Sequence, residues 1–201
     1  MEFLEALDVV DEFFMKRGPV HRTLERITRR LGDEQVPYAV LGGMALVAHG
    51  YVRPTDDVDI LTTPDGLEKI REQLVGRGYL PAFRGARKTF RDTDTGVKVE
   101  FITAGEYPGD GKPKPVRFPH PAQASVELDG KSVITLPKLI ELKLASGLSA
   151  PHRRLRDLAD VQDLITALSI PRSMADSLDP SVRDEYLRMW DAAQTPDALK
   201  E

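Results

Sequence analysis

Two aspartates separated by one residue have the type and spacing of a metal-binding pair. Asp57 and Asp59 lie in residues 57–61, where acidic and aliphatic side chains alternate. Residues i and i+2 of a strand face the same side, so both carboxylates project from one face with Cα atoms about 7 Å apart. Mg²⁺ prefers carboxylate oxygens together with substrate phosphates, so the pair predicts a magnesium site. Solvated acids on an exposed edge strand are the alternative.

Two glycines precede this pair. Gly42 and Gly43 directly follow the short apolar run 38–41, which predicts a buried strand, and a short helix is expected over residues 44–49. Glycine lets the backbone approach a ligand closely and leaves N–H groups pointing outward. The start of the following helix also suits a phosphate. A tight strand-to-helix turn without any ligand is the alternative.

A third acid, Glu100, lies on a strand predicted over residues 97–102, on the same face as Lys98. If this strand lies beside residues 57–61, Glu100 can join the two aspartates. Three carboxylates that face a phosphate-binding turn make a two-metal site for phosphoryl transfer. The alternative is that Glu100 pairs with a lysine or an arginine.

The elements around these residues predict an α+β protein with a small mixed β-sheet flanked by helices and a carboxyl-terminal helical lobe. Helices are expected over residues 2–17 and over residues 65–77. Another helix is expected to follow Gly18-Pro19 and to end at about residue 31. Hairpin turns are expected at Asp94-Thr95-Gly96 and Asp129-Gly130. After Pro137 the chain is expected to form three helices, over about residues 138–148, 153–168 and 181–193, with Pro171 and Pro180 between the last two. The predicted division is 1–35 for amino-terminal helices packed on the core, 36–135 for the α/β core, and 136–201 for the helical lobe.

Composition excludes several classes of protein. The 201 residues are 41% hydrophobic, which is enough for a core, and contain no cysteine, which excludes disulfides, thiolate metal sites and cysteine nucleophiles. The net charge of −4 gives no whole-chain electrostatic footprint for nucleic acid. No apolar stretch approaches the ~20 residues of a membrane span, and the amino terminus is acidic. We therefore expect a soluble cytoplasmic protein with no membrane partner.

Together these motifs resemble the DNA polymerase β-type nucleotidyltransferase superfamily. Gly42-Gly43, then Arg53-x-Thr55-x-Asp57-x-Asp59, then a later acid, follow its order, and the spacing looks most like the AbiEii-type branch, which contains toxin nucleotidyltransferases. The resemblance implies a nucleotidyltransferase fold, with Mg²⁺ held by the two aspartates and Glu100. It also implies that Arg53 supports the strand or a phosphate, and that Thr55 orders the acidic turn. Glu100 stands where aspartate is common in the superfamily.

A second motif lies in the predicted helical lobe. Lys143, followed by Arg156-Asp157-x-x-Asp160, resembles a helical motif of the same branch. By that likeness Lys143 touches the nucleotide phosphates, and Asp157 is a base or a residue that orients Lys143. An ordinary network of helical ion pairs is the alternative.

The resemblance implies transfer of a nucleoside monophosphate from an NTP to a hydroxyl acceptor. The acceptor could be a tRNA 3′ end, as for toxin-like relatives, a small alcohol such as an antibiotic, or a protein hydroxyl. A cognate antitoxin is a further expected partner. A local set of basic residues could serve a tRNA: Arg84, Arg87, Lys88, Arg91, Lys112, Lys114 and Arg117. The alternative function is a catalytically impaired module that binds a nucleotide or a partner on the same fold.

Overall fold

The computed structural model describes residues 12–13 and 17–194. The helix expected over residues 2–17 therefore lies outside the described residues, apart from 12, 13 and 17. The chain forms two compact units. The first contains the residues through 104 together with 119–134, and the second contains 105–118 together with the residues from 135 onward. The predicted three-part division stays a prediction.

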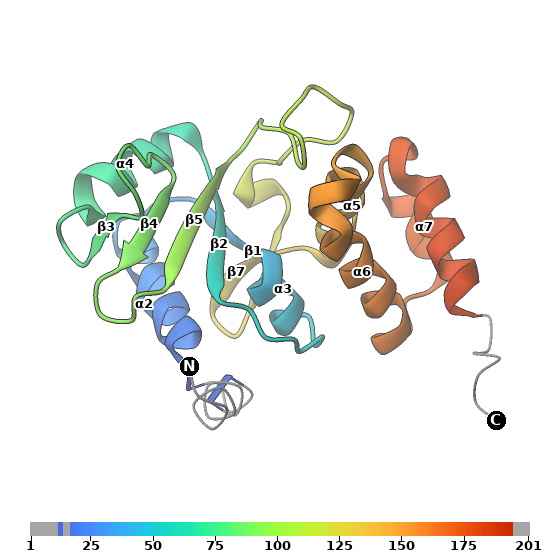
Figure 1. Ribbon diagram of the computed structural model, residues 1–201, viewed down its shortest axis with the longest axis horizontal. Coiled ribbons are helices and arrows are strands. Elements are labelled where there is room, and N and C mark those ends of the chain that lie inside the picture. The colour runs from blue at the N-terminus through green and yellow to red at the C-terminus, as the bar shows by residue number, and fades with distance from the viewer. Residues whose placement is uncertain (1–11, 14–16, 195–201) are drawn as a thin grey trace. The chain divides into compact units, whose positions relative to one another are not determined.

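The first unit is built on a seven-stranded mixed sheet (Figure 1). Its strands are β1 Tyr38–Leu41, β2 Asp57–Thr62, β3 Tyr79–Pro81, β4 Thr89–Asp92, β5 Lys98–Thr103, β6 Ser125–Leu128 and β7 Lys131–Ile134. In space their order is β3-β4-β5-β2-β1-β7-β6. The β2–β5 and β1–β7 pairs are parallel and the other pairs are antiparallel. The helices of this unit are α2 Pro19–Asp33, α3 Gly42–Ala48 and α4 Pro64–Leu74, with a short 3-10 helix at Pro121–Gln123.

Polar and apolar residues alternate along β2 and β5. The core lies on the face of the sheet to which the apolar residues of these strands point. Val58 and Ile60 of β2 and Val99 of β5 are fully buried, and Phe101 packs edge to face against Phe90 of β4 with ring centroids 5.7 Å apart. Burying each such side chain contributes about 1.5–3 kcal/mol relative to leaving it exposed. The same alternation turns the polar residues of β2 and β5 to the opposite face.

Several element boundaries differ by a few residues from the sequence prediction, and two of these differences change the path of the chain. Helix α3 begins at Gly42 rather than at residue 44, because the chain turns into the helix directly at the glycine pair. Helix α4 ends at Leu74 rather than at residue 77. Val75 is extended and forms a bridge to Tyr79, since Gly76 has a left-handed φ of +77° that turns the chain back. This turn leads into β3, a strand that the sequence analysis did not predict.

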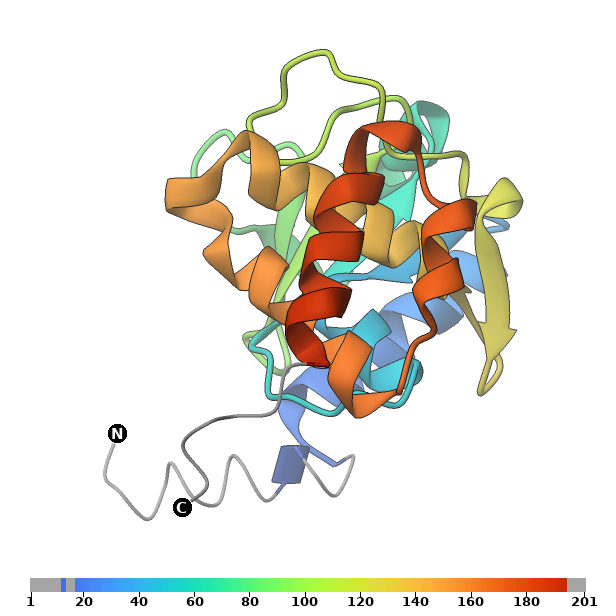
Figure 2. The same ribbon diagram turned by 90° about the vertical axis from the view of Figure 1, so that its right-hand side faces the viewer.

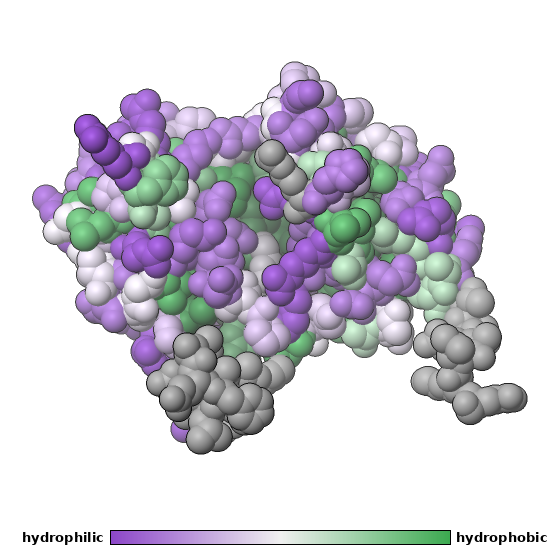
Figure 3. Space-filling model, viewed as in Figure 1, coloured by the Kyte–Doolittle hydropathy of each residue, from purple (hydrophilic) through white to green (hydrophobic). Residues whose placement is uncertain are grey.

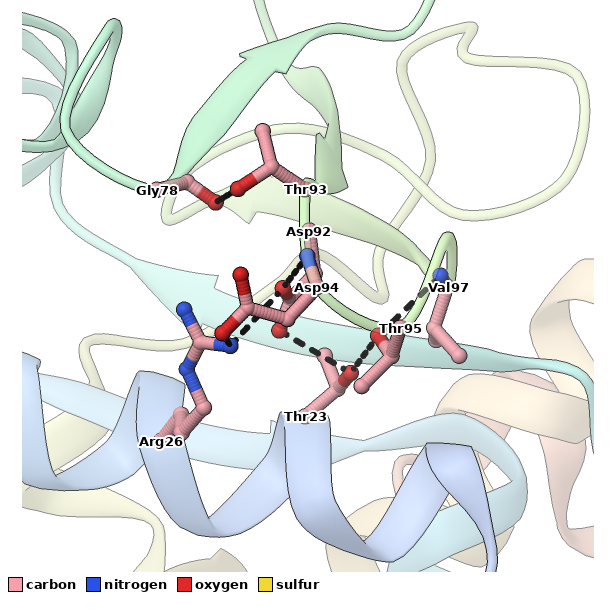
Figure 4. A network of polar contacts seen from close by, with 8 residues as sticks. All are labelled: Thr23, Arg26, Gly78, Asp92, Thr93, Asp94, Thr95 and Val97. Carbon is pink, nitrogen blue, oxygen red and sulfur yellow. Dashed lines mark hydrogen bonds and ion pairs between the residues drawn. The ribbon is translucent and has the colours of Figure 1, made fainter.

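A buried polar network joins α2 to the β4–β5 hairpin (Figure 4). The carboxylate of Asp92 is fully buried, accepts a hydrogen bond from Thr23 at 3.1 Å, and lies 3.2 Å from the guanidinium of Arg26. It also accepts a bond from the backbone N–H of Asp94 at 2.9 Å, and Asp94 itself pairs with Arg26. Thr95 is 2.5 Å from Thr23, so the predicted turn is fixed to the helix. The network thereby holds the start of β5.

The second unit is helical (Figure 2). It contains α5 Leu136–Ser149, α6 Pro151–Ala167, α7 Pro180–Ala193 and a 3-10 helix at Arg172–Ser177. Helices α5 and α6 approach so closely that a Cβ on Gly147 would lie 2.4 Å from the side chain of Leu158. Glu141 is buried in α5 and caps the chain before α7 by accepting from the N–H of Asp179 at 2.7 Å. The three predicted helices are confirmed.

The surface is mostly polar on the face shown in Figure 3. Exposed apolar residues occur near β3, where Leu80 is 52% and Phe83 is 64% exposed. Within residues 12–13 and 17–194, the helices are all too short or too polar to cross a membrane.

Candidate active site

The two aspartates of β2 share the polar face of the sheet. Val58 and Ile60 point to the core with no exposed surface, whereas Asp57 and Asp59 are partly exposed between them. The orientation expected from the alternation is therefore confirmed. Both carboxylates are accessible from the same side of one strand.

Glu100 joins this face from the neighbouring strand. Strand β5 runs parallel to β2, and Glu100 is the register partner of Asp59 while Lys98 is the register partner of Asp57. The condition on which the Glu100 prediction depended, that the two strands are adjacent, is therefore met. Its role as a metal ligand stays a prediction.

The ammonium group of Lys98 lies among these acids. Its Nζ is 3.0 Å from Oδ2 of Asp57 and 3.6 Å from Oε2 of Glu100. Burial lowers the pKa of Lys98, but the hydrogen bond and charge of Asp57 and the charges of Glu100 and Asp59 raise it, and the pKa lies above its usual value. Lys98 is therefore charged, and the pairing of Glu100 with a lysine, considered above as an alternative, is present.

The glycine pair lies directly against the acidic strand. Gly42 has a left-handed φ of +59°, and a Cβ on it would lie 1.9 Å from Oδ2 of Asp59. A Cβ on Gly43 would lie 2.7 Å from the Cβ and the hydroxyl of Thr55. Strand β1 pairs with β2 so that Leu41 is opposite Asp59, which brings the turn after Leu41 onto the carboxylate. Only glycine fits at both positions without displacing a neighbour.

The turn before β2 is ordered by its own side chains. The hydroxyl of Thr55 donates to Oδ1 of Asp57 at 3.1 Å, which corresponds to the ordering role expected for Thr55. Arg53 donates to the backbone oxygen of Pro54 at 3.2 Å. Asp57 therefore has one oxygen on Thr55 and the other on Lys98, and its side-chain orientation is fixed from both sides.

The second unit contains a separate, more deeply buried ion cluster. Lys143 is 7% exposed, and its Nζ donates to Asp157 at 2.9 Å and to Asp160 at 2.7 Å. Ser146 donates to the other oxygen of Asp157 at 2.7 Å. Asp157 is thus in contact with Lys143, and its role as a base or as an orienting residue stays a prediction. Two of the three N–H donors of the ammonium are used in this cluster.

Three contacting residues were not among the predicted site residues. Lys98 lay on the same strand face as Glu100, and that spacing was a usable signal. Asp160 was part of the helical motif but received no role. Ser146 lies one helical turn from Lys143 within the helix predicted over residues 138–148, so this spacing was also a usable signal.

The donor set of the β2–β5 face suits a hard divalent cation at the two aspartates. Within the described part of the chain, however, no three histidine, aspartate or glutamate side chains lie close enough together to hold a metal ion jointly. The third acid, Glu100, is instead paired with the ammonium of Lys98, which also contacts Asp57. With a cation bound to the two aspartates, this arrangement can neutralise phosphate charge. The backbone at Gly42 can also contact a ligand directly.

Comparison with solved structures identifies the fold. The antibiotic-resistance factor ANT(2″)-Ia, solved in complex with adenylyl-2″-tobramycin, superposes with a TM-score of 0.53 at 10% identity, covering 87% of this chain and 98% of that one. A nucleotidyltransferase-type protein from Thermotoga maritima gives 0.49 at 22% identity, with 69% and 91% covered. One from Helicobacter pylori gives 0.45 at 18% identity, with 89% and 82% covered. The predicted α+β nucleotidyltransferase fold is confirmed.

A search of curated proteins found no match. The model of one protein family matches residues 10–179, which is most of the chain. The chain belongs to that family, described as uncharacterised nucleotidyltransferase.

Proposed function

We propose that the protein transfers a nucleoside monophosphate from an NTP to a hydroxyl acceptor in a reaction that depends on Mg²⁺. The acceptor oxygen loses its proton and bonds to the α-phosphorus, and the bond between the α- and β-phosphates breaks to release pyrophosphate. The observation that carries the proposal is the close fit of the glycine turn to the acidic strand. The backbone at Gly42 approaches Asp59 so closely that no side chain is tolerated, and Thr55 fixes Asp57. Membership of the nucleotidyltransferase family supports NTP-dependent transfer in general.

In this proposal Asp57 and Asp59 hold the cation, with Glu100 as the third acid. When bound, Mg²⁺ neutralises charge on the triphosphate and lowers the pKa of the attacking hydroxyl. The backbone of the glycine turn supplies N–H donors to the phosphate oxygens. Thr55 keeps the carboxylate of Asp57 in one orientation, and Arg53 supports the turn. The work of these residues is positioning and charge stabilisation.

Lys143 is proposed to bind phosphate with its remaining N–H donor. Asp157 and Asp160 hold the ammonium in place, and Ser146 fixes Asp157 in turn. Asp157 therefore acts as a positioning residue. The ammonium of Lys143 offers a positive charge to a phosphate.

The acceptor is proposed to be a hydroxyl group. ANT(2″)-Ia was solved in complex with adenylyl-2″-tobramycin, so a protein of this fold is found with an adenylyl group joined to a small molecule. A tRNA 3′ end, as expected from the likeness to the AbiEii-type branch, is the second acceptor class. A cognate antitoxin belongs to that second case.

A catalytically impaired binding module is the alternative function, and one observation favours it. Glu100 lies 3.6 Å from the Lys98 ammonium, which is the pairing expected if the third acid no longer binds a metal. On this alternative the protein still binds a nucleotide or a partner, but transfers nothing.

Incubation with Mg²⁺ and each labelled NTP distinguishes these functions, with total tRNA or aminoglycosides as acceptors. We expect label on an acceptor with the natural chain, and its loss in the double variant Asp57→Asn with Asp59→Asn. The matched control is Asp56→Asn, which removes an exposed neighbouring charge and should leave transfer intact. Nucleotide binding without any transfer would favour the impaired module. Absence of both binding and transfer would contradict the proposed function.

A further inference from the structure

The proposed function leaves one feature unexplained, a lysine that lies among several carboxylate side chains. Lys98 comes from β5 and reaches Asp57 on β2, while Glu100, two residues further along β5, lies on the same face. The ammonium contacts one oxygen of each acid, at 3.0 and 3.6 Å. It thus bridges the two strands through carboxylate oxygens, as a metal ion shared by Asp57 and Glu100 would do.

We propose that the Lys98 ammonium takes the place of one divalent cation, so that this site holds a single metal ion rather than two. The inference rests on the proposed function, because it concerns the acids that would bind Mg²⁺. It also gives Glu100 a role: the glutamate holds the ammonium between the strands. Lys98 is a positioning residue on this view, because it fixes Asp57 and Glu100.

Charge supports a single metal ion. Three carboxylates and one ammonium carry a net formal charge of −2, which one divalent cation neutralises. Two divalent cations beside the ammonium would leave an excess of positive charge before the nucleotide binds. The repulsion between the fixed ammonium and a second cation a few ångströms away acts at close range, where salt screens it little.

Geometry supports the same conclusion. The three acids do not gather around one point in the described residues, although Glu100 and Asp59 are register partners. Lys98 is anchored on a central strand whose backbone is hydrogen-bonded on both sides, by β2 and by β4. Its Cα is therefore fixed, and its contact with Asp57 is reinforced by Thr55 on the opposite oxygen of that carboxylate.

Mn²⁺ titration of the full chain tests the inference by a readout that does not depend on turnover. Calorimetry and electron paramagnetic resonance count bound Mn²⁺, and the double variant Asp57→Asn with Asp59→Asn gives the background to subtract. We expect one Mn²⁺ per chain for the natural protein. We expect Lys98→Met to bind a second Mn²⁺, or to bind the first at least about tenfold more tightly, because a close like charge has been removed.

The matched control is Lys131→Met on β7 of the same sheet. It removes the ion pair of Lys131 with Glu25 of α2 and should leave Mn²⁺ binding unchanged. Circular dichroism checks folding, and Lys98→Gln serves if Lys98→Met does not fold. Two Mn²⁺ bound to the natural chain, or no gain in either Lys98 variant, would overturn the inference. One Mn²⁺ bound without any nucleotide transfer would instead leave Lys98 in its assigned place and contradict the proposed function.

Discussion

Replacing Gly42 by alanine should lower the free energy of unfolding more than replacing another glycine that also has a left-handed φ. Gly42 has a φ of +59°, and its added Cβ would meet Oδ2 of Asp59 at 1.9 Å and Cγ at 2.8 Å. Gly130, in the β6–β7 turn, has a φ of +70°, but nothing lies within 4 Å of its added Cβ. The two positions share the backbone penalty and differ in the steric clash.

The magnitudes follow from these two contributions. A left-handed conformation costs a residue with a side chain about 1–2 kcal/mol. Forcing an extra methyl into a packed site costs a further ~1–3 kcal/mol. We therefore expect Gly130→Ala to lower the free energy of unfolding by about 1–2 kcal/mol, and Gly42→Ala to lower it by about 2–5 kcal/mol. Nucleotide transfer should also fall in Gly42→Ala, because Asp59 must move.

Urea unfolding followed by circular dichroism measures both variants, and a double-mutant cycle with Asp59→Ala isolates the clash. Removal of the Asp59 carboxylate takes away the two closest contacts, so Gly42→Ala in that background should cost only about 1–2 kcal/mol. In the double variant, the stability lost to the clash at Gly42→Ala would be regained, but nucleotide transfer would not be regained. Equal costs for Gly42→Ala and Gly130→Ala, or an absence of coupling with Asp59, would refute the close approach of the glycine turn to the acid.

Three further predictions concern buried polar groups. Asp92→Ala should lower the free energy of unfolding in urea by about 2 kcal/mol, since Thr23 and Arg26 lose a charged acceptor; a loss below 0.5 kcal/mol would contradict the network in Figure 4. Lys143→Met should cost about 3–5 kcal/mol, because Asp157 and Asp160 keep buried charges without a cation; stability measured in the Asp157→Asn background should show part of this loss removed. Burial and the charge of Asp92 raise the pKa of Tyr79 from 10.0 to about 12, so the folded state keeps this proton where the unfolded state has lost it. Stability from this group is complete below pH 10 and is lost as the pH rises towards 12, and Tyr79→Phe should flatten that part of the pH profile while costing little at pH 7.

The sequence predicted the parts of the fold that depend on local patterns. The alternation in residues 57–61 and 97–102 identified which side chains share a face, because the two-residue period of a strand fixes that relation by itself. The three carboxyl-terminal helices were predicted with prolines as their boundaries. Strand β3 was missed because it has only three residues and depends on the turn at Gly76, whose effect is a tertiary one.

Contacts between elements could not be predicted in the same way. Gly42 and Asp59 are 17 residues apart, and their approach depends on the β1–β2 register that places Leu41 opposite Asp59. The partners of Lys143 lie on the next helix, and their distances depend on how closely α5 and α6 pack at Gly147. Side-chain type and spacing gave the candidates, and strand register and helix packing determine which of them touch.

The glycine turn and the acidic strand therefore form a single structural feature rather than two motifs. A side chain at position 42 is excluded by Asp59, and one at position 43 is excluded by Thr55, which itself orients Asp57. The acidic segment therefore requires glycine at both positions of the turn that faces it. A substitution in the turn disturbs the acidic segment, and a substitution in the acidic segment disturbs the turn. Lys98 extends this dependence to β5, because it holds Asp57 from the side opposite Thr55 and connects it to Glu100. The orientation of Asp57 consequently depends on Thr55 in its own segment and on Lys98 from β5. Each motif is a weak signal in the sequence because the contacts between the glycine turn, the acidic segment and β5 join residues that are far apart along the chain.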